Sequence, residues 1–204
     1  MMKDLVYRQL AQSIATMHTL LHDPLIANTL VTIGELTANS MKNGHKLLVA
    51  GNGGSAADAQ HLVAEFVVRL TTNRPALRAI ALTVDTSILT AAGNDFGYDT
   101  VFSRQIEAIG APGDVFLGIS TSGNSKNIVK ALQQAKKQSI TTIGLTGSTG
   151  GEMRGLCDHT IIVPSEVTMN IQECHLALEH IFCMLVERST FGMDFERKPQ
   201  HLSE

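Results

Sequence analysis

The stretch Lys46-Leu47-Leu48-Val49-Ala50-Gly51-Asn52-Gly53-Gly54-Ser55 decides the fold of this chain. Its first half ends at Ala50 and is almost wholly apolar, as expected for a β-strand that is buried on both faces. Its second half is a glycine-rich turn, and residues 56–69 then show a helical pattern. A buried strand, a glycine turn and a helix in this order are typical of the first unit of a parallel α/β sheet.

The same alternation continues along the chain. Four more short apolar runs follow, and helical stretches lie between most of them. With right-handed crossovers, this order predicts an α/β, doubly wound fold, in which a mostly parallel sheet of five strands has helices on both faces. The further predicted strands are residues 79–82, 115–119, 142–145 and 160–163, and the predicted helices are residues 56–69, 85–92, 125–137 and 171–189.

The segment before the first strand predicts an N-terminal helical hairpin. Apolar residues recur every three or four positions from Val6 to Leu21. Asp23-Pro24 is typical of a helix start, and Asn43-Gly44 of a helix end. Such a hairpin can pack on its own sheet or against another subunit, and the sequence leaves both possibilities open.

Length and composition predict one cytoplasmic domain without nucleic-acid or membrane partners. The 204 residues carry a net charge of -3, no tryptophan and no basic run. No apolar segment approaches the roughly 20 residues that span a bilayer. Three cysteines without a paired motif are typical of a reducing compartment. We expect a hairpin over residues 1–44, an α/β core over 45–192 and a loosely ordered tail over 193–204.

Two loops directly after predicted strands predict a phosphate site. The first is Gly51–Ser55 and the second is Ser120-Thr121-Ser122-Gly123-Asn124-Ser125. Ligands of parallel sheets bind at the carboxyl ends of the strands, and helix N-termini offer free N–H groups to an anion. Ordinary turn and helix-capping chemistry is the alternative, but two such loops favour a phosphate.

A dinucleotide site is a weaker interpretation of the first loop. Gly51, Gly53 and Ala56 match the pattern G-x-G-x-x-A. The acidic residue expected about 20 positions later is missing, because that region reads Arg74-Pro75-Ala76. Neither loop carries the Gly-Lys-Ser/Thr of a P-loop, so a phosphorylated small molecule is favoured.

Two pairs of polar residues on predicted helices are candidates for chemistry. His61 and Glu65 are four residues apart and therefore share one helix face. Gln172 and His180 lie roughly on one side of the last predicted helix, where His175 and Glu179 compete for any role. Imidazole and carboxylate suit Zn²⁺, and a carboxamide oxygen is a rarer ligand. A solvated His/Glu pair and a buried core histidine are the structural alternatives.

These motifs together resemble the phosphoheptose isomerases of the sugar isomerase domain superfamily. The resemblance also includes Gly93-Asn94-Asp95 and Ile171-Gln172-Glu173, and it extends over nearly the whole chain. It implies an aldose–ketose isomerase that converts sedoheptulose 7-phosphate to D-glycero-D-manno-heptose 7-phosphate, the first step toward the heptose of the lipopolysaccharide core. It further implies a homotetramer with active sites between subunits and one Zn²⁺ per subunit.

The resemblance also implies the roles of individual residues. Glu65 and His180 would form the acid/base pair of a proton transfer through an enediol. The implied metal ligands are His61, Glu65, Gln172 and His180. The implied substrate-binding residues are Asn52, Gly53, Gly54, Ser55, Glu65, Asn94, Asp95, Ser120, Thr121, Ser122, Ser125 and Gln172.

One departure from the family pattern and three alternative functions stay open. Relatives often carry arginine where this chain has Asn170, and residues 165–169 also differ, so substrate preference could differ. The main alternative is a non-catalytic tetrameric regulator of replication initiation from the same superfamily. That branch lacks the carboxylate that Glu65 supplies here, which favours the isomerase. A sugar-phosphate sensor and an isomerase of another sugar phosphate are the other two alternatives.

Overall fold

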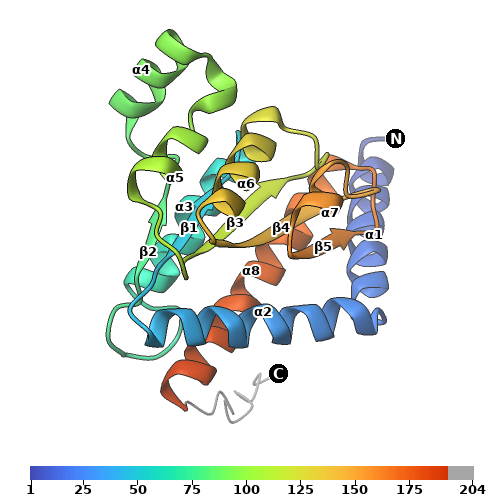
Figure 1. Ribbon diagram of the computed structural model, residues 1–204. Coiled ribbons are helices and arrows are strands. Elements are labelled where there is room, and N and C mark those ends of the chain that lie inside the picture. Colours follow the sequence, from blue (N-terminus) through green and yellow to red (C-terminus); the bar gives the residue numbers. More distant parts are fainter. Residues whose placement is uncertain (193–204) are drawn as a thin grey trace.

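The computed structural model describes residues 1–192 and contains one five-stranded sheet (Figure 1). The strands lie in the order β2-β1-β3-β4-β5, and every neighbouring pair is parallel. The predicted α/β fold with a five-stranded parallel sheet is therefore confirmed. The tail expected from residue 193 onward lies outside the described residues. The strands are β1 (Leu47–Ala50), β2 (Ala79–Ala81), β3 (Val115–Ser120), β4 (Thr141–Gly147) and β5 (His159–Val163).

The helices include all those predicted and two short ones that were not. Helices of seven and four residues, α5 and α7, are too short for their apolar period to be recognised in the sequence. The fourth helix continues to Phe96 rather than ending at residue 92. The helices are α1 (Met2–Leu21), α2 (Pro24–Lys42), α3 (Gly54–Val67), α4 (Thr86–Phe96), α5 (Ser103–Ile109), α6 (Lys126–Lys137), α7 (Met153–Leu156) and α8 (Thr168–Phe191), with a 3-10 turn over Tyr98–Thr100.

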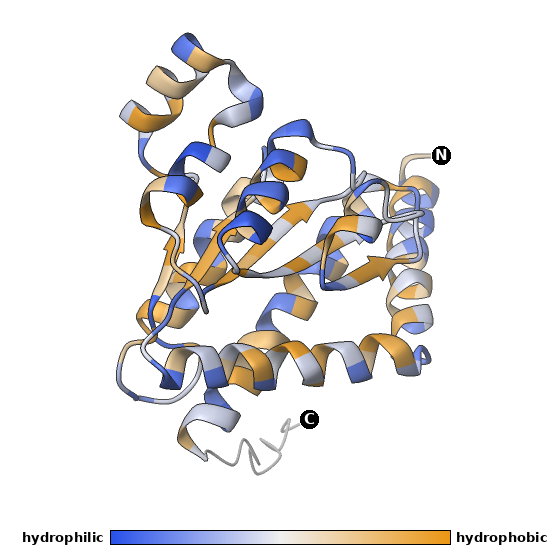
Figure 2. Ribbon diagram, in the orientation of Figure 1, coloured by the Kyte–Doolittle hydropathy of each residue, from blue (hydrophilic) through white to orange (hydrophobic). Residues whose placement is uncertain are grey.

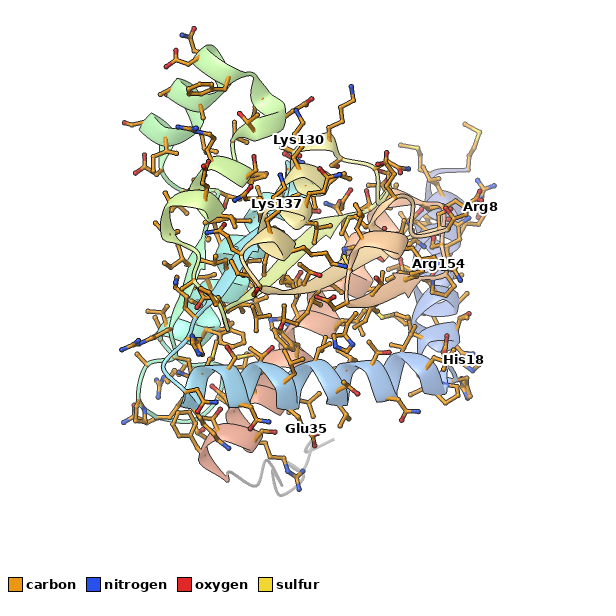
Figure 3. The ribbon with its side chains drawn as sticks, viewed as in Figure 1. Arg8, His18, Glu35, Lys130, Lys137 and Arg154 are labelled. Carbon is orange, nitrogen blue, oxygen red and sulfur yellow. The ribbon has the colours of Figure 1, made fainter. Side chains whose placement is uncertain are left out.

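Two apolar layers cover the two faces of the sheet, because successive strand residues point to opposite faces. Leu47 and Val49 pack with residues of α2, α3 and α8. Leu48 and Ala50 pack with residues of α4, α5, α6 and α7. Figure 2 shows the apolar residues concentrated in the strands and on the helix faces next to them, while α6 turns Lys130 and Lys137 outward (Figure 3). Helices α3 and α8 therefore share one face of the sheet.

The two N-terminal helices pack differently. The side chain of Asp23 accepts a hydrogen bond of 2.9 Å from the N–H of Leu25 and so caps α2. Helix α2 lies against α8, while α1 runs in a different direction (Figure 1). On α1, the predicted apolar stripe is largely exposed: Val6, Leu10 and Ile14 are 57%, 56% and 68% accessible. One helix of the predicted pair thus completes the core, and the other presents an uncovered apolar face.

Among residues 1–192, no helix combines the length and the apolar character that crossing a bilayer requires.

Candidate active site

The order of the strands reverses between β1 and β3. From β1 the chain continues to β2 at one edge of the sheet. From β3 it continues to β4 and β5, toward the opposite edge. Ligands of open α/β sheets bind at such a reversal, beyond the carboxyl ends of the strands. The glycine loop Gly51–Ser55 leaves β1 at this point, and the serine loop Ser120–Ser125 leaves β3. The two predicted phosphate loops are therefore neighbours.

The serine loop forms a compact cluster of hydroxyl groups. The Oγ of Ser120 lies 2.9 Å from that of Ser125 and 3.5 Å from that of Ser122. Gly123 has a φ of +67°, and a Cβ at this position would collide with the backbone of Gly150. The loop therefore needs glycine there, both for its conformation and for its contact with the segment after β4.

A pair of asparagines joins the two loops. The side chains of Asn52 and Asn127 exchange hydrogen bonds of 2.9 and 2.8 Å, and the hydroxyl of Tyr98 donates to the Oδ1 of Asn52 at 3.2 Å. Asn127 is only 3% exposed. The amide of Asn52, a predicted substrate-binding residue, thus fixes the glycine loop to the first turn of α6. Neither Asn127 nor Tyr98 was predicted, although a polar residue on the buried face of α6 is a signal that the sequence offers.

Three polar side chains meet where α3 and α8 lie side by side on one face of the sheet. The Nε2 atoms of His61 and His180 are 2.9 Å apart, and the Nε2 of His61 is 3.6 Å from the Oε1 of Glu65. The rings of the two histidines meet edge to face. We call His61, Glu65 and His180 the triad. His61 is exposed, while Glu65 and His180 are partly buried, so a ligand can reach the triad from solvent.

The triad has the donor set of a possible metal site. One nitrogen or oxygen of each of the three residues lies within 4.8 Å of the others. A tetrahedral zinc ion with bonds of about 2.0–2.1 Å holds its ligands roughly 3.3 Å apart, which is close to this spacing. Two imidazoles and a carboxylate also match the ligands that zinc takes in catalytic sites.

Gln172 lies near the start of α8, and its side chain packs against the start of α3. A Cβ at Gly54 would collide with the Gln172 amide, so this glycine allows α8 to approach the glycine loop. His61 lies two turns further along α3. Gln172 therefore joins the loop end of the site to the helix that carries His180.

Two neighbours on α8 that competed with His180 lie elsewhere. His175 is fully buried, and its Nε2 is 3.1 Å from the carbonyl oxygen of Thr146. Burial lowers the pKa of His175 to about 4, so its ring is neutral at pH 7. Burial, and then the nearby Asp58, raise the pKa of Glu179 to about 8. Its two carboxylate oxygens have no hydrogen-bond partner within residues 1–192. His180 is the residue of this group that meets the triad.

Asn94 and Asp95 are not joined to the loops or the triad by any hydrogen bond or ion pair between described residues. Both lie on the exposed side of α4, where Asn94 donates to Asp95 at 2.7 Å. Figure 1 shows α4 projecting away from the rest of the chain. Within one chain, these two predicted substrate-binding residues are therefore separate from the others.

Asn170, where relatives often carry arginine, has a buried side chain that contacts α1. Asn170 is 2% exposed, and its Oδ1 accepts a hydrogen bond of 2.9 Å from the side chain of Gln9 on α1. The side chain at this position therefore holds α1 against the start of α8.

The fold and site are those of a parallel α/β protein with two small-residue loops beside a histidine–carboxylate centre. The family model for the SIS domain matches residues 10–147. The phosphoheptose isomerase of Akkermansia muciniphila is 53% identical over 167 residues, which cover 82% of this chain and 88% of that protein. The phosphoheptose isomerase of Aneurinibacillus thermoaerophilus is 50% identical over 194 residues, which cover 95% and 98%.

Solved structures agree with the sequence comparisons. The phosphoheptose isomerase of Neisseria gonorrhoeae superposes with a TM-score of 0.86 at 40% identity, over 92% of this chain and 99% of that one. That of Francisella tularensis gives the same TM-score at 33% identity. The chain belongs to the phosphoheptose isomerase family.

Proposed function

We propose that this chain isomerises sedoheptulose 7-phosphate to D-glycero-D-manno-heptose 7-phosphate, as the first step toward the heptose of lipopolysaccharide. Its relatives at about 50% identity are phosphoheptose isomerases. The single observation that carries the proposal is the convergence of Glu65 and His180 on adjacent helices. Both helices begin next to the paired loops, where a phosphate would bind.

The loops would hold the phosphate away from the reacting carbons. Hydroxyls of Ser120, Ser122 and Ser125 and the N–H groups at the starts of α3 and α6 supply donors without adding positive charge. Binding energy from this remote group can orient the reacting end of the sugar.

The chain's own acid and base would move the protons. Ketose and aldose interconvert when a proton leaves one carbon and returns to its neighbour, while a second proton moves between the oxygens. Glu65 would carry the proton between the carbons, and His180 would serve the oxygens and the opening of the ring. Zn²⁺ held by His61, Glu65 and His180 would supply a Lewis acid that stabilises negative charge on the sugar oxygens. Gln172, the fourth ligand that the resemblance implies, lies against Gly54, two turns of α3 from His61.

The proposed functional unit is a cytoplasmic homotetramer of single-domain subunits. The exposed apolar face of α1 is of a kind that a second subunit covers. Asn94 and Asp95 lie apart from the rest of their own site, which supports a site completed between subunits. Three free cysteines agree with a reducing compartment.

Incubation with sedoheptulose 7-phosphate tests the function directly. We expect the purified protein to form the aldose, and to leave unphosphorylated sedoheptulose almost unchanged at the same concentration. Metal analysis of the same sample should find about one zinc per chain, and a chelator should remove the activity. Absence of turnover with zinc bound, together with binding to a replication initiator protein, would instead support the regulator.

Exchange of Asn127 for alanine tests the link between the loops. The change leaves the Asn52 amide without its buried partner, so the glycine loop loses its fixed position. We expect KM for the sugar phosphate to rise about tenfold, the size of one lost hydrogen bond of roughly 1–1.5 kcal/mol, with a smaller change in kcat. Gln134→Ala, a change on the same helix away from the loops, should leave KM unchanged. An unaltered KM in Asn127→Ala would show that the link does not shape the phosphate site.

A further inference from the structure

We infer that Arg74 and Glu187 are positioning residues that hold α3 against α8 and thereby keep the triad together. The inference rests on the proposed function, because the triad is taken as the reacting centre. Neither side chain bonds to a side chain of the triad, and Arg74 reaches Glu65 only at its backbone carbonyl. They act on the two helices that carry the triad.

Arg74 binds the end of α3. Its Nη2 donates to the carbonyl oxygen of Glu65 at 2.7 Å, and its Nη1 donates to that of Phe66 at 2.7 Å. The last carbonyls of a helix have no partner within the helix, and a cation there also interacts favourably with the helix dipole. The guanidinium therefore fixes the last turn of α3, including the backbone of the proposed base.

Glu187 connects the same guanidinium to α8. The Nε of Arg74 donates to the Oε1 of Glu187 at 2.6 Å, and both side chains are 0% exposed. Glu187 follows His180 by seven residues, so the two lie two turns apart on the same side of α8. The ion pair is thus a direct link between the helix of His61 and Glu65 and the helix of His180.

The link is one of three successive contacts along the α3–α8 interface. His61 meets His180 first, the rings of Phe66 and Phe182 follow at 5.6 Å, and Arg74 meets Glu187 beyond them. These contacts advance in the same direction along both segments. A shift of either helix at the ion pair would therefore change the separation of the histidines.

Arginine is the side chain that this arrangement requires. Its planar group donates to one carboxylate and to two helix carbonyls at the same time. Lysine would preserve the charge beside Glu187, but its single ammonium group cannot reproduce that fixed fork. Arg74→Lys therefore separates the positioning role from simple charge balance.

The test compares two variants with a matched control. Arg74→Lys keeps the buried charge paired, and the double variant Arg74→Met with Glu187→Met removes both charges, so neither leaves an unpaired buried carboxylate. The control is Lys46→Met, which breaks the ion pair of 2.6 Å between Lys46 and the buried Asp114, a pair that involves no residue of α3 or α8. Thermal stability, kcat, KM and a metal-free crystal structure are measured for each.

We expect kcat to fall about 10–100-fold in both Arg74 variants while KM changes less than about threefold, since misplacement by about 1 Å can cost that much. The distance between the Nε2 atoms of His61 and His180 should increase in their metal-free crystals. Lys46→Met should lose stability without either change. An unchanged distance in the Arg74 variants, or an equal loss of kcat in Lys46→Met, would overturn the inference. If the wild-type protein shows no turnover, the proposed function fails, and the crystal distances still decide the positioning role.

Discussion

Glu65→Gln is expected to lower kcat on the order of 10³-fold while leaving the fold and the assembly intact. A positioned acid or base typically contributes about 10²–10⁴-fold to the rate. Glutamine has nearly the same shape as glutamate but cannot accept the carbon-bound proton. Because Glu65 is partly exposed and its Oε1 is 3.6 Å from the Nε2 of His61, the exchange leaves no buried charge unpaired.

One measurement and one control variant test whether the effect is specific to the base. Turnover in D₂O reports whether the carbon-bound hydrogen of the substrate exchanges with solvent, and this exchange should disappear in Glu65→Gln. The matched control is Glu35→Gln, because Glu35 is exposed on α2 and points away from the sheet (Figure 3). We expect the control to keep its kcat within about twofold. Undiminished hydrogen exchange in Glu65→Gln would remove this residue as the base.

His180→Gln is expected to reduce both the zinc affinity and kcat. The imidazole nitrogen of His180 is one of the three converging donors, and an amide is a weaker zinc ligand than an imidazole. Loss of one of three strong ligands should weaken zinc binding by at least about 100-fold, and kcat should fall by a similar factor or more. Competition with a zinc-binding dye measures the affinity without using activity.

The neighbouring histidine on α8 supplies the control. His175 bonds to the carbonyl oxygen of Thr146 in the core and does not reach the triad. His175→Gln should therefore lower the melting temperature and leave zinc affinity nearly unchanged. Zinc affinity equal to that of the wild type in His180→Gln would exclude this residue as a ligand.

Much of the fold could be predicted because its signals are local. The apolar run Leu47–Ala50 and its glycine loop required only neighbouring residues to be recognised as a buried strand and a turn. The same holds for Asp23-Pro24 at the start of α2. The direction of α1 and the short helices α5 and α7 could not be predicted, since packing and not periodicity determines them.

In the candidate site, too, local spacing could be predicted and contacts between distant segments could not. Spacing along one helix placed His61 and Glu65 on a common face, but no spacing relates either of them to His180, 119 residues away from His61. The Asn52–Asn127 pair and the Arg74–Glu187 pair likewise join segments 75 and 113 residues apart. Family resemblance proposed some of these residues, and it did not include Asn127, Glu187 or a structural role for Arg74.

By itself the sequence determined the kinds of parts in this protein: buried strands, two anion-type loops and a helix bearing a histidine and a carboxylate. These features depend on interactions among residues within a few positions of one another. Only the tertiary structure decided that β1 and β3 are neighbours and that α3 and α8 cover the same face of the sheet. Strand order and helix packing bring distant residues within a few ångströms, because they minimise the exposed apolar surface of the whole chain and not of any one segment.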